Sequence, residues 1–361
     1  MPESNYAAQP AGPDRDSARE LILVTGGTGL IGKAVVDRLA RNYGVLSLDR
    51  EPASNDPDPL KSYKMDLASE EDVHSVIARI KSDFGSRIAS VVHLAAYYDF
   101  EGRPSDLYDE ITVKGSERLI EALKHKDLKV EQFIFSSSLL VYAPQPPQHK
   151  ITEESPLLPK WDYPESKVKA QKVIQAENED IPVVILRIAG VYNDEGHSIP
   201  ITNHIQRIYE KQISSHFYPG NLSYGNPFVH LDDLVEAIEL AIKKRKQLPH
   251  ETVINIGEDV TLSYGYLQNE IGMLLHNRKW KTYKIPKLMA KIGAWIQNLF
   301  GKNFIKPWMI DLTDDHMEID ISKARELLGW EPKHSLKQTL PKIIASLKKD
   351  PEAWLKVNKL K

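Results

Sequence analysis

Near the start of this chain of 361 residues, three glycines separate an apolar run from a helical pattern. The run from Glu20 to Val24 has the length and composition of a buried strand, and glycines follow it at positions 26, 29 and 32. Apolar residues then recur at helical spacing, at Leu30, Ile31, Val35, Val36 and Leu39. A strand, a tight turn and a helix in this order predict the first unit of a parallel sheet.

The turn has the properties of a phosphate-binding loop. Gly26 allows a sharp exit from the strand, Gly29 allows the backbone to approach a pyrophosphate, and Gly32 allows the helix to pack closely on the strand. The free N–H groups and the positive dipole end of the helix then face the phosphates. The dinucleotide contacts predicted at this turn are Gly26, Thr28, Gly29, Leu30, Ile31 and Gly32.

The next predicted strand, residues 44–49, ends on the carboxylate of Asp49. An acidic side chain at this point accepts hydrogen bonds from the adenosine ribose hydroxyls and repels a 2′-phosphate, so it favours NAD. Arg50 leaves NADP open as the alternative, because a guanidinium pairs with a 2′-phosphate.

Composition excludes several classes of function. The chain has 47 basic and 50 acidic residues, and this balance does not suit a nucleic-acid-binding protein. The absence of cysteine excludes disulfides, thiolate catalysis and cysteine-ligated metals, and we expect a reducing, cytoplasmic location. Residues 1–19 have no apolar h-region, so we expect a disordered tail rather than a signal peptide.

Strand-like and helical segments alternate along residues 20–192. The expected strands after residue 49 are 63–67, 91–96, 133–135 and 183–186, and the expected helices are 70–84, 104–125 and the one carrying Tyr163. This alternation predicts an α/β fold with a doubly wound parallel sheet, a Rossmann domain.

Residues 193–361 have a looser pattern. We expect them to form mainly a smaller C-terminal substrate-binding portion, with some segments returning to the Rossmann domain. Its predicted helices are 199–213, 263–276 and 286–300, and its predicted short strand is 252–256.

Tyr163 and Lys167 lie four residues apart, on one face of a predicted helix. A free phenol titrates near pH ~10, and a neighbouring ammonium favours the phenolate, so the pair predicts an acid or base that works near neutrality. Ser138 ends a predicted strand 25 residues upstream, where its hydroxyl is placed to donate a hydrogen bond to a substrate oxygen. We predict Ser138, Tyr163 and Lys167 as catalytic residues.

These motifs resemble those of one family. The chain is similar, from about residue 20 to 345, to the extended branch of the short-chain dehydrogenase/reductase superfamily, the NAD-dependent epimerase/dehydratase group. Beyond the glycine turn and the Ser138, Tyr163 and Lys167 set, the matching segments are 66–67, 93–96, 136–138, 141–142, 186–187, 190–192, 228–234, 254–257, 322–325 and 328–332.

The resemblance implies a mechanism and a cofactor site. By this similarity Tyr163 is the acid/base, Lys167 lowers its pKa and binds the nicotinamide ribose, and Ser138 polarises the substrate carbonyl or hydroxyl. Hydride passes between a substrate carbon and the nicotinamide. The further cofactor contacts in these motifs are Asp66, Leu67, Leu94, Ala95, Ala96, Ser136, Ile188 and Gly190. The resemblance also implies a homodimer paired through the helices at about 104–125 and 162–179.

Departures from the family pattern narrow the activity. Thr112 stands where the family usually has asparagine, so the supporting role of that amide is in doubt. Leu139 and Leu140 follow the catalytic serine, where sugar dehydratases carry Asp-Glu, so we do not expect dehydratase activity. We expect an NAD(P)-dependent oxidoreductase or epimerase acting on a secondary alcohol or ketone, such as a sugar nucleotide, a sterol-like or another cyclic alcohol. A non-catalytic NAD(P)-binding regulatory protein is the alternative.

Aromatic residues and histidines are the remaining candidates for a small-molecule substrate site. The expected substrate contacts are Tyr98, Ser138, Tyr192 and His230. Tyr97, Phe100, His216, Phe217 and Tyr218 fit either an apolar pocket or ordinary packing. His93 and His230 match no ligand spacing, so we expect no metal.

The segment 286–300 carries apolar residues on one helical face, with lysines around it. We interpret it as a core-facing helix, which is the usual reason for such a pattern. The alternative is peripheral contact with a membrane or a lipid.

Overall fold

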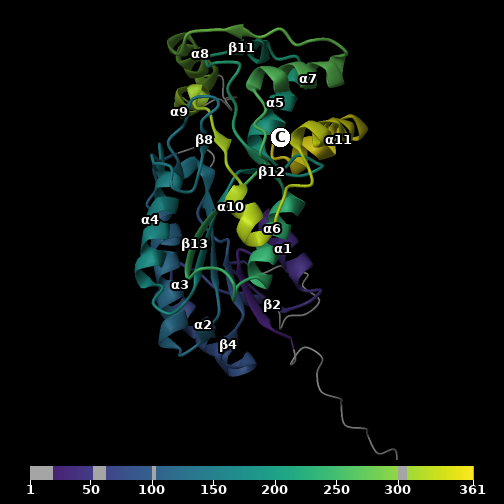
Figure 1. Cartoon of the computed structure of the whole chain (residues 1–361). Coiled ribbons are helices and arrows are strands. Elements are labelled where there is room, and N and C mark those ends of the chain that lie inside the picture. The colour runs from purple at the N-terminus through teal and green to yellow at the C-terminus, as the bar shows by residue number, and fades with distance from the viewer. Residues whose placement is uncertain (1–18, 52–61, 100–102, 300–306, 361) are drawn as a thin grey trace, which may run out of the picture.

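The computed structural model describes residues 19–51, 62–99, 103–299 and 307–360 (Figure 1). Its central sheet has seven strands in the order β3-β2-β1-β5-β7-β9-β13, all parallel to their neighbours. The strands are β1 (Leu21–Thr25), β2 (Gly44–Asp49), β3 (Ser62–Lys64), β5 (Ser90–His93), β7 (Phe133–Ser138), β9 (Val183–Ile188) and β13 (Glu251–Ile256). This sheet confirms the predicted doubly wound α/β fold.

Helices cover both faces of the sheet. One face packs against α1 (Leu30–Leu39), α6 (Leu231–Lys243) and α10 (Ser322–Leu328), and the other against α2 (Glu70–Phe84), α3 (Lys114–His125) and α4 (Asp162–Glu177). In β1, Ile22 and Val24 join the first cluster and Leu23 joins the second, as the alternation of side chains along a strand requires.

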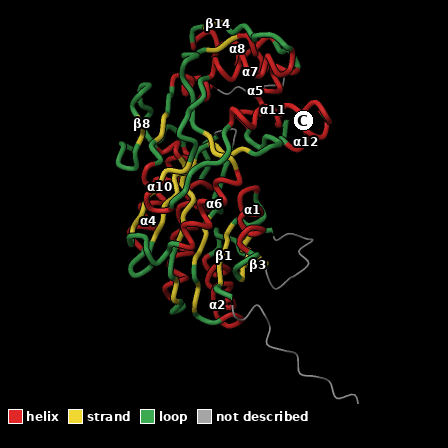
Figure 2. Tube along the Cα trace, turned by 45° about the vertical axis from the view of Figure 1, so that its right-hand side comes forward, coloured by secondary structure: helices red, strands yellow, loops and turns green. Residues whose placement is uncertain are grey.

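A third buried cluster lies in the C-terminal portion, beyond one end of the sheet strands (Figure 2). It is built by α5 (Ile199–Tyr209), α7 (Tyr264–His276), α11 (Leu336–Lys349) and α12 (Pro351–Val357). The fully buried Ile205, Leu340 and Ile343 lie among these helices, and Trp280 packs with them.

Short strand pairs and two further helices complete the described chain. The pairs are β4 (Arg87–Ile88) with β6 (Lys129–Val130), β8 (Lys150–Ile151) with β15 (Glu318–Ile319), β10 (Gly190–Tyr192) with β12 (Phe228–His230), and β11 (Phe217–Tyr218) with β14 (Tyr283–Lys284). The helices are α8 (Lys287–Leu299) and α9 (Pro307–Asp311).

One predicted strand lies in the main sheet, and one predicted helix differs from the sequence prediction. The predicted strand at 252–256 is β13, an edge strand of the main sheet. The predicted helix at 104–125 begins with a π-helical turn, Tyr108–Val113, before α3. The hydroxyls of Tyr108 and Thr112 accept hydrogen bonds from the amides of Asp99 and Tyr97, and these bonds hold the wider turn against that loop. Residues 1–18 of the predicted tail, and Phe100, lie outside the described residues.

Candidate active site

The glycine turn after β1 needs its glycines. Gly26 has a φ of 73°, and a Cβ added to it would lie 2.9 Å from the Ala95 amide nitrogen. A Cβ on Gly32 would lie 2.0 Å from the Gly26 carbonyl oxygen, so α1 packs against the turn at backbone distance. Gly29 caps α1 without a side-chain hydrogen bond, and the first turn of the helix holds no acidic residue. The N-terminus of α1 is therefore suited to an anionic ligand.

Asp49 is fixed against this turn. Its carboxylate accepts hydrogen bonds from the Thr28 amide at 3.2 Å, the Thr28 hydroxyl at 3.0 Å and the Ser47 hydroxyl at 2.7 Å. Sequence reasoning missed Ser47, although a polar side chain two residues before Asp49 on the same strand face was a usable signal. The three bonds place the carboxylate beside the glycine turn, where the ribose of a bound dinucleotide is expected.

The other predicted cofactor contacts lie around the same end of the sheet. The amides of Leu94 and Ala95 bond to the carbonyl and hydroxyl oxygens of Thr25, so the segment after β5 is fixed beside the glycine turn. Asp66 accepts a hydrogen bond from the amide of Ala68. Of the remaining predicted contacts, Leu67 is buried, Arg50 is exposed, Ala96 follows Ala95, Ile188 ends β9 and Gly190 begins β10.

His93 forms a buried polar chain between β1 and α3. The Thr25 hydroxyl lies 2.7 Å from His93 Nδ1, and His93 Nε2 lies 2.9 Å from the Ser116 hydroxyl. Ser116 donates to the Thr112 carbonyl oxygen, so His93 Nε2 carries the proton and donates to Ser116. Burial, with the nearby charge of Lys167, lowers the pKa of His93 to about 3. A neutral imidazole with both nitrogens engaged has a structural role.

The three predicted catalytic side chains meet where β7 ends against α4. Lys167 donates from Nζ to the Ser136 carbonyl oxygen at 2.7 Å, and its Nζ lies 5.9 Å from the centre of the Tyr163 ring. The Tyr163 hydroxyl is hydrogen-bonded to Ser138. Because Ser138 is the last residue of β7, its hydroxyl and the phenol share the carboxyl edge of the sheet, where doubly wound folds bind ligands.

Burial dominates the electrostatics of this group. It raises the pKa of Tyr163 above its ordinary value, and it lowers the pKa of Lys167 to about 7. The sequence predicts the opposite direction for Tyr163, because the motif identifies a neighbouring ammonium but not the loss of water around the phenol. The hydrogen bond from Ser138 acts in the lowering direction, but burial outweighs it.

Aromatic rings surround the phenol. Tyr98 meets the Tyr163 ring edge-on at 4.9 Å between centroids and is 50% exposed, and the Trp161 ring lies at 5.4 Å. Trp161 was missed by sequence reasoning, although it directly precedes the catalytic helix. Beside it lies a pocket of about 50 Å³, lined by Leu140, Tyr142, Lys160, Trp161, Asn226, Leu312, Asp315 and Met317. Tyr98 and this pocket are the parts of the structure best placed to meet a substrate beside Tyr163.

A buried polar cluster supports the strand end beneath the pocket. The Tyr142 hydroxyl donates to Asn255 Oδ1 at 2.8 Å and accepts from Arg187 Nη1 at 2.7 Å. Arg187 also donates to Gln171 Oε1 at 3.1 Å, and the Gln171 amide donates to the Ser137 hydroxyl. These bonds connect β7, β9, β13 and α4, so they fix the position of Ser138 relative to Tyr163.

Comparison with known proteins agrees with this geometry. The model of the NAD dependent epimerase/dehydratase family matches residues 22–257. The chain belongs to this family. It is 30% identical over 342 residues to a UDP-glucose 4-epimerase of Lactobacillus helveticus, covering 87% of this chain and 92% of the relative. It is 28% identical over 353 residues to that of Vibrio cholerae, covering 93% and 96%.

A solved structure of a UDP-glucose 4-epimerase also matches this chain over most of its length. The UDP-glucose 4-epimerase of Thermotoga maritima, determined with UDP-glucose, superposes with a TM-score of 0.67 at 25% sequence identity. The match covers 91% of this chain and 99% of that one. The chain therefore shares the fold and nearly the full length of a sugar-nucleotide epimerase of its family.

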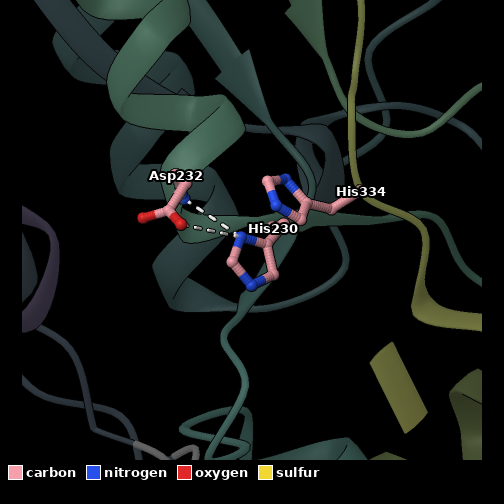
Figure 3. A group of neighbouring side chains, drawn as sticks. All are labelled: His230, Asp232 and His334. Atoms are coloured by element: carbon pink, nitrogen blue, oxygen red, sulfur yellow. Dashed lines mark hydrogen bonds and ion pairs between the residues drawn. The ribbon is translucent and has the colours of Figure 1, made fainter. Parts of the chain in front are cut away.

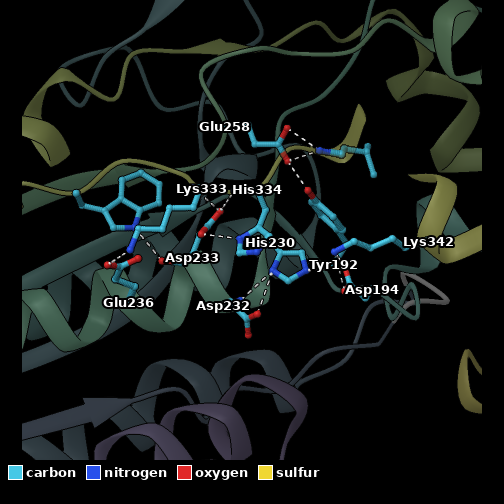
Figure 4. A network of polar contacts seen from close by, with 12 residues as sticks. Tyr192, Asp194, His230, Asp232, Asp233, Glu236, Glu258, Lys333, His334 and Lys342 are labelled. Carbon is cyan, nitrogen blue, oxygen red and sulfur yellow. Dashed lines mark hydrogen bonds and ion pairs between the residues drawn. The ribbon is translucent and has the colours of Figure 1, made fainter. Parts of the chain in front are cut away.

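Two of the predicted substrate contacts, Tyr192 and His230, lie in a different part of this epimerase/dehydratase family member from Ser138 and Tyr163. Tyr192 has no exposed surface and donates to Glu258 Oε1 at 2.8 Å, so its side chain does not face an open site in this structure. His230 is 3% exposed, and its Nδ1 accepts from the Asp232 amide (Figure 3). Both belong to a buried network that joins α6 to the start of α11 (Figure 4). His216, Phe217 and Tyr218 lie in the C-terminal portion, where His216 stacks on Trp280 and Tyr218 on Tyr264.

His230, Asp232 and His334 have ligand atoms within 4.8 Å of one another, but their geometry favours a polar network over a metal site. The two imidazoles stack at 4.2 Å, and His334 Nδ1 lies 2.9 Å from Asp233 Oδ1. Imidazoles bind a metal through lone pairs in the ring plane, and stacked rings do not aim those lone pairs at one point.

Glu258 caps α11 from inside the protein. Both of its carboxylate oxygens lie 3.0 Å from the Leu336 amide nitrogen, at the first residue of that helix. The carboxyl group is 4% exposed, and burial raises its pKa to about 7, with a further contribution from Asp233. Burial therefore favours the protonated form of this acid.

We expect the stability of the protein to fall as pH rises toward neutrality because of Glu258. The folded state holds its proton more tightly than the unfolded chain, whose pKa is near 4.5, so the contribution is complete below that value and is lost as pH rises through about 7. Its size is on the order of 3 kcal/mol. Thermal melts between about pH 5 and about pH 8 test this. Glu258→Gln, which does not titrate, should flatten the dependence, and an unchanged slope would contradict the assignment.

Proposed function

We propose that this protein is an NAD-dependent oxidoreductase or epimerase acting on a secondary alcohol or its ketone. The observation that carries the proposal is the meeting of Ser138, Tyr163 and Lys167 at the carboxyl edge of a sheet whose glycine turn is shaped for a dinucleotide. NAD, when bound, supplies a positively charged nicotinamide that accepts and returns the hydride. Ser138 and Tyr163 hold the substrate oxygen, and Tyr163 takes or gives its proton.

Lys167 supports the phenol of Tyr163 in this proposal. Its Nζ is held by the Ser136 carbonyl oxygen, so the lysine is oriented by the strand that also positions Ser138. When charged, it favours the phenolate of Tyr163 and offsets the effect of burial. Because burial lowers the pKa of Lys167 to about 7, its positive charge is gained or lost near neutral pH.

Epimerisation of a sugar nucleotide is the form of this activity that the two relatives named above support, since both are UDP-glucose 4-epimerases. Dehydration is disfavoured, because Leu139 is buried and Leu140 is apolar where an additional acid and base would be required. The test uses UDP-glucose and UDP-galactose as probes, followed by NMR, with mass spectrometry of the purified protein for a retained dinucleotide. Interconversion with retained NAD supports an epimerase.

A dehydrogenase gives a different result in the same experiment. Added NAD and a panel of cyclic secondary alcohols, including sterols, would then increase the absorbance of NADH. A protein that binds NAD but turns over neither group of probes would support the non-catalytic alternative and contradict the proposal.

We expect NAD to bind at least about tenfold more tightly than NADP, because the buried Asp49 carboxylate repels a 2′-phosphate. Isothermal calorimetry with each dinucleotide measures the difference. Arg50→Gln should leave NAD binding unchanged and weaken NADP binding further, because the exposed guanidinium is the group suited to the phosphate. Tighter binding of NADP would contradict the role given to Asp49.

A further inference from the structure

Helix α8 has its large apolar residues on the outside. Leu288 is 70% exposed, Met289 60%, Ile292 51% and Trp295 64%. Leu288, Ile292 and Trp295 recur at spacings of four and three, so they form one stripe along the helix. The core-facing orientation favoured by the sequence is therefore wrong. These four residues are called the α8 stripe below.

Lysines attach α8 to the rest of the protein. Lys287 Nζ lies 2.9 Å from Asp314 Oδ2, and Lys291 Nζ lies 2.7 Å from Asp311 Oδ1. These residues are on α9 or directly after it, and α9 packs on α8 in Figure 1. The helix is thus held along its charged edge, and each side chain of the α8 stripe remains more than half exposed.

Helix α8 and the segment before it carry basic residues and no acidic ones. Residues 279–299 include five lysines, at 279, 281, 284, 287 and 291, and no aspartate or glutamate. Lys281 and Lys284 are exposed on either side of Tyr283, which is itself 56% exposed. Lysine is depleted in protein–protein interfaces, whereas lysines beside Trp, Tyr and Leu are typical of helices that lie on anionic lipid surfaces.

We propose that the α8 stripe docks the protein onto an anionic lipid surface. A helix of 13 residues is about 20 Å long, too short to cross a hydrocarbon core of about 30 Å. No helix among the described residues is long and apolar enough to span a membrane. The helix therefore lies in the plane of the surface, with the stripe among the acyl chains and the lysines at the headgroups.

The position of α8 links this surface to the candidate site. The chain continues from α9 into Leu312 and Asp315, which line the pocket beside Trp161. Lys160, which also lines this pocket, pairs with Asp315. If the protein docks through the α8 stripe, only the short helix α9 separates α8 in the chain from the segment that lines the pocket.

Flotation with vesicles tests the proposal. The full chain should bind vesicles of phosphatidylcholine with about 30% phosphatidylglycerol, bind phosphatidylcholine alone much more weakly, and lose affinity in high salt. Ile292→Asp with Trp295→Asp should lower the partition coefficient at least about tenfold. Lys281→Glu with Lys284→Glu should lower it at least about fivefold at low salt. Phe84→Asp, an exposed site at the end of α2, is the matched control and should change nothing.

A single-site probe shows which face is buried. Because the chain has no cysteine, Trp295→Cys provides one thiol for an environment-sensitive dye. The dye should move to a less polar environment on anionic vesicles, while the same dye at Phe84→Cys should not. Absence of binding to anionic vesicles would overturn the proposal. Self-association in light scattering that the Ile292→Asp, Trp295→Asp variant abolishes would also overturn it, since a second copy would then cover the stripe.

Discussion

Tyr163→Phe should lower turnover by roughly 10²–10⁴-fold while the affinity for NAD stays unchanged. The phenol is the only group of the catalytic set that our proposal gives a proton to carry, and its removal leaves Ser138 and Lys167 in place. The ring keeps its contacts with Tyr98 and Trp161, so we expect the melting temperature to stay close to that of the wild type. Steady-state rates with the substrate found by the probe panel, together with calorimetry for NAD, measure the two effects separately.

Tyr98→Phe is the matched control for this experiment. It removes a neighbouring phenol that touches the Tyr163 ring but, in our proposal, carries no proton. Its effect on turnover should be less than about tenfold, because it alters only packing and polarity beside the substrate. Full turnover by Tyr163→Phe, or an equal loss in both variants, would show that the proton passes through a different group.

Gly32→Ala should destabilise the fold and abolish dinucleotide binding. The new Cβ would lie 2.0 Å from the Gly26 carbonyl oxygen and 2.6 Å from the Gly27 Cα, and both are backbone atoms that move only with the whole turn. We expect a loss of about 3 kcal/mol or more in the free energy of unfolding. The affinity for NAD should fall at least about 100-fold, since the turn and the N-terminus of α1 would separate. Urea unfolding and calorimetry provide the measurements.

Two other glycines serve as controls for that loss. Gly29→Ala has an ordinary φ of -70° and one close contact, the Gly26 oxygen at 3.3 Å, which must shift by only a few tenths of an ångström, so the variant should weaken NAD binding with a much smaller loss of stability than Gly32→Ala. Gly293→Ala on α8 meets nothing within 4 Å and should leave NAD binding unchanged while stabilising the helix by up to about 1 kcal/mol. Wild-type stability and NAD affinity in Gly32→Ala would contradict the close packing of α1 on the turn.

The parts of this molecule that were predictable depend on local chemistry. Parallel strands are buried on both faces, so they appear as continuous apolar runs, and the polar residues that end them mark the carboxyl edge. Ser138 and Asp49 were predicted as site residues this way. The glycine turn was predictable because its backbone excludes other residues at Gly26 and Gly32.

The rest depended on partners that are distant in the sequence. Tyr192 is an aromatic residue of the kind that lines pockets, but its hydroxyl donates a hydrogen bond to Glu258, 66 positions later in the sequence. Periodicity identified the apolar face of α8 but not the side on which its neighbours lie. For Tyr163, the motif located Lys167 but gave no information on burial, which reverses the direction of the pKa shift.

The hydrogen bonds on Asp49 have a consequence for redesigning cofactor preference. The usual route to NADP is to replace the acidic residue at this position, but here that residue also accepts the amide and hydroxyl of Thr28 and the hydroxyl of Ser47. Removing the carboxylate would leave the Thr28 and Ser47 donors without their acceptor, in the turn that is proposed to bind the pyrophosphate. A change of cofactor preference in this chain therefore requires coordinated substitutions at Asp49, Thr28 and Ser47. A single substitution at Asp49 would be expected to weaken the turn before it improved NADP binding.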